Sequence, residues 1–586
     1  MGWTGEGARA DSAAFSHRAT STRGVPSSDT ERTKYMSEEQ AKIQADRDLI
    51  LDAKKKGGFE VVKAYTRLSG PGWLQSAITL GGGSLAGSLY LGVIGGYQFM
   101  WLQPIMMILG ILMLSAIAYV TLSTGEKPFR AINKHVNPVL GWGWLIASMM
   151  ANLVWAMPQF SLGTAAIQQN LGILQGSDAL CAVLLFLVAG VVIWFYDSGG
   201  WGIKLFEIIL KVMVGIVVLS FFGVVVALSV KGDGLPWGEI LVNFIPNLSL
   251  MNAPADAFTD IIHQSGNPGF WTSLIVDLQR EKMIAAAATA VGINMTFLLP
   301  YSMLKRGWDK DFRGLAAFDL STGLFVPFLI ATSCVVIAAA SQFHGKYDTG
   351  LTGEGAPTEM TPKYMGEYTG FLKKRMAADG TDVSSMDGDA VVAASMNLPV
   401  QDRQLAAMLV NRDSGALAGS LENLTGPGVA QFVFGIGVIG MAVSTIIILM
   451  LINGFTLCEA MGVEPKGVIH RIGSYLPGVT GSLGFLFLWS NASAKFYLAV
   501  PTSVFGMVLL PIAYVTFFMM MNNKALLGDN ILKGNKRIAM NIGMGVAIAA
   551  AGTGSLYAIY SKGPVAMGAF GIFVAAVVVA QFMKKK

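Results

Sequence analysis

Two apolar stretches of the 586-residue chain, 69–101 and 283–304, are interrupted near their middle by small and polar residues. Glycine accepts non-helical backbone angles and weakens a helix, so each interruption predicts two half-helices joined by an unwound segment. Unwound backbone at membrane depth is tolerated only where protein buries it or where it lines a water-filled cavity. The interruptions are therefore the candidate substrate site, whose predicted residues are Gly81, Gly82, Gly83, Ser84, Asn294, Met295 and Thr296.

The candidate site offers neutral oxygen and amide groups, and the metal ligands expected among them are Ser84, Asn294 and Thr296. Together with carbonyls freed by unwinding, this set can hold a hard cation that keeps much of its water, as Mg²⁺ prefers. It can equally bind a small zwitterion whose carboxylate meets exposed helix N-termini. A purely structural role also stays open for both stretches: the glycines would allow close helix packing, and the second stretch would be an ordinary helix kinked at Pro300.

The composition is typical of a polytopic membrane protein, because 53% of the residues are hydrophobic, 13% are charged and 69 are glycines. The three cysteines are isolated from one another, so we expect neither a disulfide framework nor a thiolate metal site. Besides the stretch that begins at residue 69, apolar runs close to the ~20 residues that a bilayer demands recur along the chain. They predict an all-α fold of about twelve transmembrane helices, the further runs being 98–123, 139–169, 179–196, 204–229, 283–304, 314–342, 427–458, 473–490, 496–521, 538–560 and 563–583.

Basic residues gather on one side of the membrane if these helices alternate in direction. The positive-inside rule then places both termini in the cytosol. The chain is thus predicted to be a multi-pass protein of the inner or plasma membrane, whose partners are the lipid bilayer and a small solute or metal ion. The basic residues are explained without a nucleic-acid partner, and the oligomeric state is left open.

The predicted organisation is a mostly disordered cytosolic tail, two groups of five helices, and two further helices. Because each group contains one broken helix, the pattern predicts two inverted repeats with the site at their interface. The predicted loop 343–426 is a lid, a partner surface or a partly disordered segment. The ranges are 1–66 for the tail, 67–230 for the first repeat, 231–282 for an extracytoplasmic loop, 283–522 for the second repeat including loop 343–426, and 523–586 for the last two helices and the basic C-terminus.

No group at the middle of a span is expected to titrate near neutral pH. The five histidines lie outside the spans or at their edges, and the carboxylates lie near span ends: Asp178, Asp197, Glu207, Asp319 and Glu459. A proton-coupled mechanism through a buried carboxylate or histidine therefore lacks its carrier. Lys204, Glu207 and Lys211 share one face at the start of a helix, where they form either an ion-paired helix end or a gate.

Several motifs resemble the Nramp family of divalent-metal transporters. Gly70-Pro71-Gly72-Trp73 matches the leading motif of the family's first helix, and the segment 95–101 matches its trailing part without a gap. Similarity covers most of residues 65–560, with further matching segments at 204–214, 435–462, 470–479 and 508–529. The resemblance implies the LeuT-like fold of the APC superfamily, an inverted 5+5 repeat in which helices 1 and 6 are broken at the substrate site.

The chain departs from the family where metal would bind. The aspartate and asparagine of the family's DPGN motif fall on Gly81 and Ser84. Its Met-Pro-His motif in helix 6 falls on 296–298, so that thioether and that imidazole are absent, and its acidic residues in helix 3 fall within 155–159. A site's affinity for soft transition-metal ions normally comes from such thioether and imidazole ligands.

The sequence therefore predicts an Nramp-related secondary transporter that works by alternating access. The leading substrate is a divalent cation, hard or hydrated in the manner of Mg²⁺, moved without the usual proton-coupling residues. One alternative is a transporter of a small organic zwitterion such as an amino acid on the same fold, and another is a non-transporting sensor or scaffold. No arrangement of residues suggests an enzyme, and no cofactor is expected, since any divalent cation would be cargo.

Overall fold

The computed structural model describes residues 29–197, 200–230, 234–358, 361–426, 428–488 and 499–584, and every regular element within these ranges is helical. The part of the predicted disordered tail at 1–28 lies outside the described residues, whereas α1 (Asp29–Lys56) and α2 (Gly58–Leu68) are helices. Arg47 of α1 forms ion pairs with Asp309 and Asp311, and these contacts fix α1 against the segment that follows residue 305.

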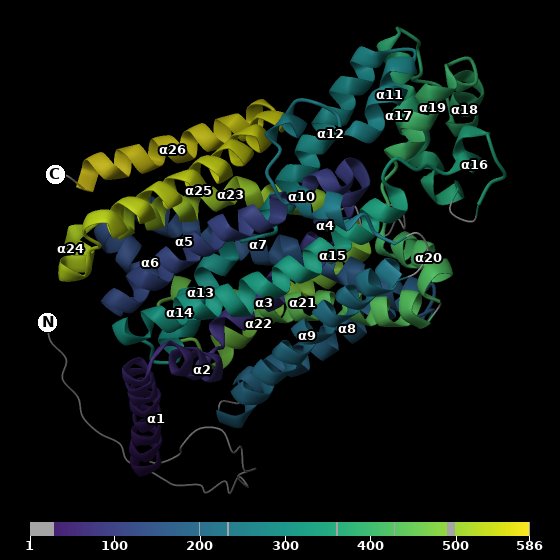
Figure 1. Cartoon of the computed structure of the whole chain (residues 1–586). Coiled ribbons are helices and arrows are strands. Elements are labelled where there is room, and N and C mark those ends of the chain that lie inside the picture. Colours follow the sequence, from purple (N-terminus) through teal and green to yellow (C-terminus); the bar gives the residue numbers. More distant parts are fainter. Residues whose placement is uncertain are drawn as a thin grey trace, which may run out of the picture.

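Long helices form the bundle, and Figure 1 shows them running roughly side by side. Ten helical segments of the described residues are long and apolar enough to cross a membrane, and a bent pair brings the number to eleven. Nine of these segments contain the long helices α5 (Leu102–Thr124), α7 (Pro138–Ala165), α8 (Asp178–Asp197), α9 (Gly200–Val230), α15 (Val326–Phe343), α21 (Phe434–Ala460), α23 (Ala499–Met521), α25 (Gly534–Ser561) and α26 (Pro564–Lys584). The tenth is formed by α12 (Pro268–Ala288) and α13 (Ile293–Lys305). A further long helix of the bundle is α22 (Gly467–Leu488).

The expected run 473–490 corresponds to α22, which falls outside that set of spans. Glycines, serines and Pro477 dilute the apolar character of α22, although it packs along α21 and α7 like its neighbours. Ten or eleven of the about twelve expected spans are thus found by length and composition among the described residues, and the end of the run 473–490 lies outside them.

The first broken helix consists of α3 (Pro71–Thr79) and α4 (Gly82–Gly95), and the two halves are bent by 55°. The break expected in the glycine run is confirmed, but it falls at Leu80 and Gly81, because Gly82 and Gly83 already belong to α4. The two helical glycines permit close approach: a Cβ on Gly82 would lie 3.0 Å from Gln159 Oε1.

The second broken helix consists of α12 (Pro268–Ala288) and α13 (Ile293–Lys305), which are separated by Thr289–Gly292. The predicted polar residues Asn294, Met295 and Thr296 therefore lie in the first turn of α13, not in the break itself. Helix α12 begins at Pro268, well before the apolar run predicted from residue 283. The prediction started late because the first part of α12 carries charged side chains, which a hydropathy pattern does not assign to a span.

The region 343–426 folds into short helices: α16 (Thr349–Thr352), α17 (Thr361–Ala378), α18 (Gly388–Ser395), α19 (Val400–Met408) and α20 (Ser414–Thr425). In Figure 1, α16 to α19 gather with α11 (Asp256–Gln264) at one end of the bundle, which we call the α17 end. Helices α1 and α2 lie at the opposite end, which we call the α1 end.

A buried carboxylate joins the α17 end to the second broken helix. Asp402 of α19 is fully buried and accepts hydrogen bonds from Trp271 Nε1 at 2.7 Å and from the backbone N–H of Gly266 at 2.7 Å. Arg375 of α17 forms an ion pair with the same carboxylate at 2.5 Å. Because a buried charge is tolerated only when it is paired and hydrogen-bonded, α17 and α19 are held to the start of α12.

Candidate functional site

A small cavity of about 40 Å³ lies where the two helix breaks face each other. A single water needs about 10–15 Å³ on the same measure, so the cavity has room for roughly three waters. Its walls come from both broken helices and from α7, α21 and α23: Ile78, Thr79, Gly81, Gly83, Ser84, Trp155, Pro158, Gln159, Thr289, Gly292, Met295, Thr445, Thr502 and Ser503. None of these side chains is ionisable, so the described lining of the cavity is neutral.

Four of the seven predicted site residues line this cavity, namely Gly81, Gly83, Ser84 and Met295. The other three face neighbouring helices. The backbone N–H of Gly82 donates to Gln159 Oε1 at 2.7 Å, Asn294 Nδ2 donates to Asn152 Oδ1 at 3.0 Å, and the Thr296 hydroxyl accepts from Trp144 Nε1 at 2.8 Å. Of the three expected metal ligands, only Ser84 therefore borders the cavity.

Gly81 occupies the tightest position in the site. A Cβ on this residue would lie 2.2 Å from Thr445 Oγ1, so that no side chain fits unless Thr445 moves. The Thr445 hydroxyl itself points at the end of α3, 3.4 Å from the carbonyl oxygens of Ala77 and Ile78. Thr445 thus fills the space beside Gly81 and gives hydrogen bonds to carbonyls near the break.

Met295 turns its sulfur toward the break. Met295 Sδ accepts from Thr79 Oγ1 at 3.1 Å and from the backbone N–H of Gly292 at 3.3 Å. Gln75 Nε2 donates to the Met295 carbonyl at 3.3 Å. A thioether is a weak acceptor, and here it satisfies one of the N–H groups that the interrupted helix leaves without a helical partner.

Ser84 closes a local ring of hydrogen bonds at the start of α4. Its hydroxyl donates to the Gly81 carbonyl at 2.9 Å and accepts from the Gly81 N–H at 3.2 Å. The unwound backbone therefore already uses the donor and one acceptor position of the Ser84 hydroxyl, which leaves one lone pair for a ligand.

Helix ends give the neutral cavity its electrostatic character. The C-terminal ends of α3 and α12 direct carbonyls toward the break regions, and the N-terminal ends of α4 and α13 direct N–H groups toward them. Partial charges of both signs thus meet at one place. Within the described ranges, no group of three or more His, Cys, Asp or Glu side chains could hold a metal ion.

Three further hydroxyl side chains that line the cavity were not predicted from the sequence: Thr445, Thr502 and Ser503. They lie in α21 and α23, where a lone hydroxyl in an apolar helix is usually explained by a bond to its own backbone. Thr502 and Ser503 do bond to the Ala499 carbonyl, at 3.1 and 2.6 Å. Only the tertiary arrangement shows that these hydroxyls face the break.

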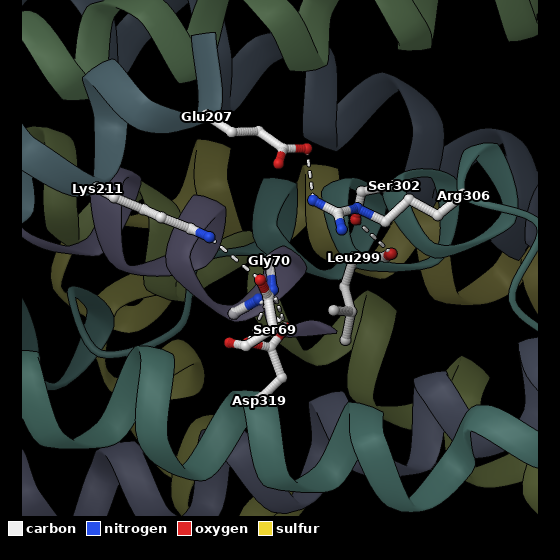
Figure 2. Close-up of polar contacts among 9 residues, drawn as sticks. Ser69, Gly70, Glu207, Lys211, Leu299, Ser302, Arg306 and Asp319 are labelled. Carbon is white, nitrogen blue, oxygen red and sulfur yellow. Dashed lines mark hydrogen bonds and ion pairs between the residues drawn. The ribbon is translucent and has the colours of Figure 1, made fainter. Parts of the chain in front are cut away.

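At the α1 end, Asp319 holds the beginning of α3 (Figure 2). This carboxylate is 1% exposed and accepts from the Gly72 N–H at 2.6 Å, from the Gly70 N–H at 3.2 Å, and from the Ser69 hydroxyl. A carboxylate that receives N–H groups at a helix start satisfies donors that the helix cannot satisfy itself. The leading Gly-Pro-Gly motif is therefore the point at which α3 attaches to the segment around Asp319.

Of the three residues predicted to share one helix face (Lys204, Glu207 and Lys211), Glu207 and Lys211 bind partners on other elements (Figure 2). Glu207 forms an ion pair with Arg306 at 2.5 Å, and Lys211 Nζ donates to the Ser69 carbonyl at 3.2 Å. A Cβ on Gly70 would collide with the Arg306 guanidinium. Helix α9, the end of the second broken helix and the start of α3 are thus joined at one place.

The sequence profile of the Nramp family, described as natural resistance-associated macrophage protein-like, matches residues 72–371 and 391–558. The chain belongs to the Nramp family. Together with the apolar helices, this membership makes the chain an integral, multi-pass membrane protein.

Curated Nramp relatives align over part of their length. The metal transporter Nramp2 of Oryza sativa subsp. japonica is 27% identical over 191 residues, which cover 31% of this chain and 33% of the relative. The metal transporter Nramp2 of Populus trichocarpa is 24% identical over 339 residues, 53% of this chain and 58% of the relative. The chain thus spans from a third to somewhat over half of these relatives.

A solved Nramp structure has the same architecture. The manganese transporter of Eremococcus coleocola, in complex with an aromatic bis-isothiourea substituted compound, superposes with a TM-score of 0.59 and 12% identity over 89% of this chain and 95% of the transporter. The expected LeuT-like fold with broken helices 1 and 6 is therefore confirmed.

The contact between Gly81 and Thr445 gives a first prediction. Gly81→Ala should lower the unfolding free energy by about 1–3 kcal/mol, the usual cost of overpacking. The pair Gly81→Ala and Thr445→Ala should recover most of that loss, because it removes the Thr445 oxygen that lies in the way. Thermal unfolding in detergent measures both.

Gly215→Ala in α9 is the matched control, since a Cβ there meets nothing within 4 Å. If Gly81→Ala proves as stable as Gly215→Ala, the packing described around Gly81 is wrong.

The Asp319 contact gives a second prediction. Asp319→Asn should loosen α3, because a neutral amide accepts hydrogen bonds more weakly and cannot serve every donor around it. Amide exchange in residues 69–79 should rise about tenfold, which corresponds to about 1.4 kcal/mol of lost local stability. Ser321→Ala, whose exposed hydroxyl only bonds to the Ala317 carbonyl, is the control. Unchanged exchange in Asp319→Asn would show that the carboxylate does not hold α3.

Proposed function

We propose that this Nramp-family chain is a secondary transporter that carries a divalent cation across the membrane through the cavity between its two broken helices. The observation that carries the proposal is the convergence of both breaks on one polar cavity inside a bundle of membrane-spanning length. Broken helices that meet at the middle of a repeat-built bundle are the usual construction of a transport site. The metal-transporter names of the relatives support a metal ion as the cargo.

The expected cation is hard and keeps part of its water. The cavity offers hydroxyl, amide and carbonyl oxygens, and its one sulfur already accepts two hydrogen bonds. Hard cations bind oxygen ligands, and Mg²⁺ in particular retains water when it binds. A neutral lining compensates little of the cost of a bare divalent charge, which favours a hydrated ion in a cavity that widens on loading.

Proton coupling through the site is not expected. No described residue that lines the cavity titrates near neutral pH, and the region of α7 that faces it contributes Trp155, Pro158 and Gln159. Transport would then follow the gradient and the membrane potential acting on the cation.

Alternating access requires that each end of the pathway opens in turn. The Asp319, Glu207 and Arg306 contacts lie at the α1 end, where α3 would have to move for release. We infer that this end faces the cytosol and that α17 and its neighbours lie outside, in accord with the distribution of basic residues.

A small zwitterion is the second candidate, because helix ends of both signs meet at the cavity. The N–H groups at the starts of α4 and α13 would receive its carboxylate, and the carbonyl ends of α3 and α12 would face its ammonium group.

Flux into vesicles that contain the purified full-length chain tests both candidates. We expect uptake of Mg²⁺ and Mn²⁺ without stoichiometric acidification, with or without a pH gradient, and no uptake of amino acids. Ser84→Ala should lower the cation uptake about 3- to 10-fold, as the loss of a single polar contact does. Ser482→Ala, whose exposed hydroxyl bonds only to its own helix, is the control.

Uptake of Mn²⁺ with coupled acidification would overturn the absence of proton coupling. Uptake of amino acids alone would overturn the metal assignment in favour of the zwitterion. Normal cation uptake by Ser84→Ala would place the substrate elsewhere.

A further inference from the structure

A second cavity, of about 300 Å³, lies toward the α17 end, and we call it the outer cavity. It is larger than the central cavity and differs in its chemistry, because ionisable side chains line it. Residues of α4, α12 and α17 meet here, among them Tyr90, Leu278, Glu281, Lys282, Glu367 and Gly370.

The outer cavity lies along the same two half-helices that form the central cavity. From Ser84 to Tyr90 on α4, and from Thr289 back to Lys282 on α12, the chain rises about 10 Å at 1.5 Å per residue. Between these levels the two helices touch closely: a Cβ on Gly87 would lie 3.0 Å from the Ala286 Cα. The Gly87 contact therefore lies between the levels of the two cavities along these helices.

Lys282 is the buried cation of the outer cavity. It is 4% exposed, and its Nζ lies 4.7 Å from the centre of the Tyr90 ring, so it bridges the outer halves of the two broken helices. An ammonium group in such a place acts on other charges with little screening, since the surrounding protein has a low dielectric constant.

Two carboxylates line the same cavity as this ammonium, and they come from two elements. Glu281 precedes it on α12, and Glu367 faces the cavity from α17, where the backbone N–H of Asn411 donates to its carboxylate at 2.8 Å. Burial raises the pKa of the Glu367 carboxyl, while the Asn411 hydrogen bonds and the charge of Lys282 act in the opposite direction. Lys374, the other lysine that lines this cavity, is exposed, so its charge is screened by water.

We propose that the outer cavity is the vestibule of the transport pathway and that the charge of Lys282 within it limits the access of divalent cations to the central cavity. The inference rests on the proposed function, since it takes the central cavity as the substrate site. Without Lys282, the carboxylates of Glu281 and Glu367 would leave the vestibule attractive to cations. Without the Glu367 carboxylate, the vestibule would attract cations less.

The charge of the vestibule can be measured without transport. Gly370 lines the outer cavity and has open space for a side chain, so Gly370→Cys supplies a reporter thiol. The three native cysteines are buried, and the parent chain without the reporter gives the background. The reporter is allowed to react with methanethiosulfonates that carry either a trimethylammonium or a sulfonate group, and the ratio of the two rates reports the local potential.

Lys282→Met should raise the ratio of cationic to anionic labelling about tenfold or more, because one desolvated charge is removed close to the thiol. Lys282→Arg, which keeps the charge, should leave the ratio within about twofold, and Glu367→Gln should lower it. Lys346→Met is the control, since this exposed lysine lies at the same end and only bonds to the Ser341 carbonyl.

In vesicles, Lys282→Met should lower the apparent KM for Mg²⁺ severalfold and change kcat less. If Lys282→Met raises kcat without changing KM, and Lys282→Arg does not, Lys282 acts only by holding Tyr90 in place. That result would overturn its role in cation access. A labelling ratio that does not respond to Lys282 in a transporting protein overturns this inference alone. Wild-type vesicles that take up no divalent cation, although the labelling ratio responds, overturn the proposed function instead.

Discussion

Breaking two helices inside a membrane leaves backbone N–H and C=O groups that must find partners within the protein, and much of the structure around the centre serves this need. Gln159 receives the Gly82 N–H, Met295 Sδ receives the Gly292 N–H, and hydroxyls of α21 reach the carbonyls at the end of α3. The polar residues of the surrounding helices thus have a structural task before they have any role toward a ligand. A substrate that enters must exchange some of these hydrogen bonds for its own, which ties loading of the site to a change in the backbone around it.

The sequence permitted prediction of the helical class, of both breaks and of most span positions, because these follow from apolar length and from the position of glycine. Prediction from the sequence was less accurate for the site, where tertiary contacts decide which polar residues border the cavity. Hydropathy cannot separate Asn294 and Thr296, which bond to α7, from Ser84, which borders the cavity, since all are polar residues near a break. Thr445 was missed because a hydroxyl within an apolar helix carries no signal of the element that it faces. The first part of α12 was assigned to a loop for a related reason: two of its charged residues, Glu281 and Lys282, line the outer cavity, and hydropathy does not show that protein surrounds them.

The two ends of the bundle are built on different principles. At the α1 end, Asp319 and Lys211 form hydrogen bonds with the start of the short helix α3. At the α17 end, the buried Asp402 joins α17 and α19 to the start of α12, so a whole layer of helices must move with that half-helix. A small element moving at one end and a large unit at the other would give the two access routes different energy barriers and different sensitivities to side-chain charge.

The space beside Gly81 also bears on how such a chain diverges within its family. Because Thr445 Oγ1 occupies the place that a Cβ at position 81 would need, a side chain introduced there has to displace Thr445. Substitutions at the two positions are therefore coupled: a change at position 81 is tolerated more easily once position 445 is smaller. Which side chain position 81 accepts is thus set by packing against α21 as well as by the chemistry of the cavity.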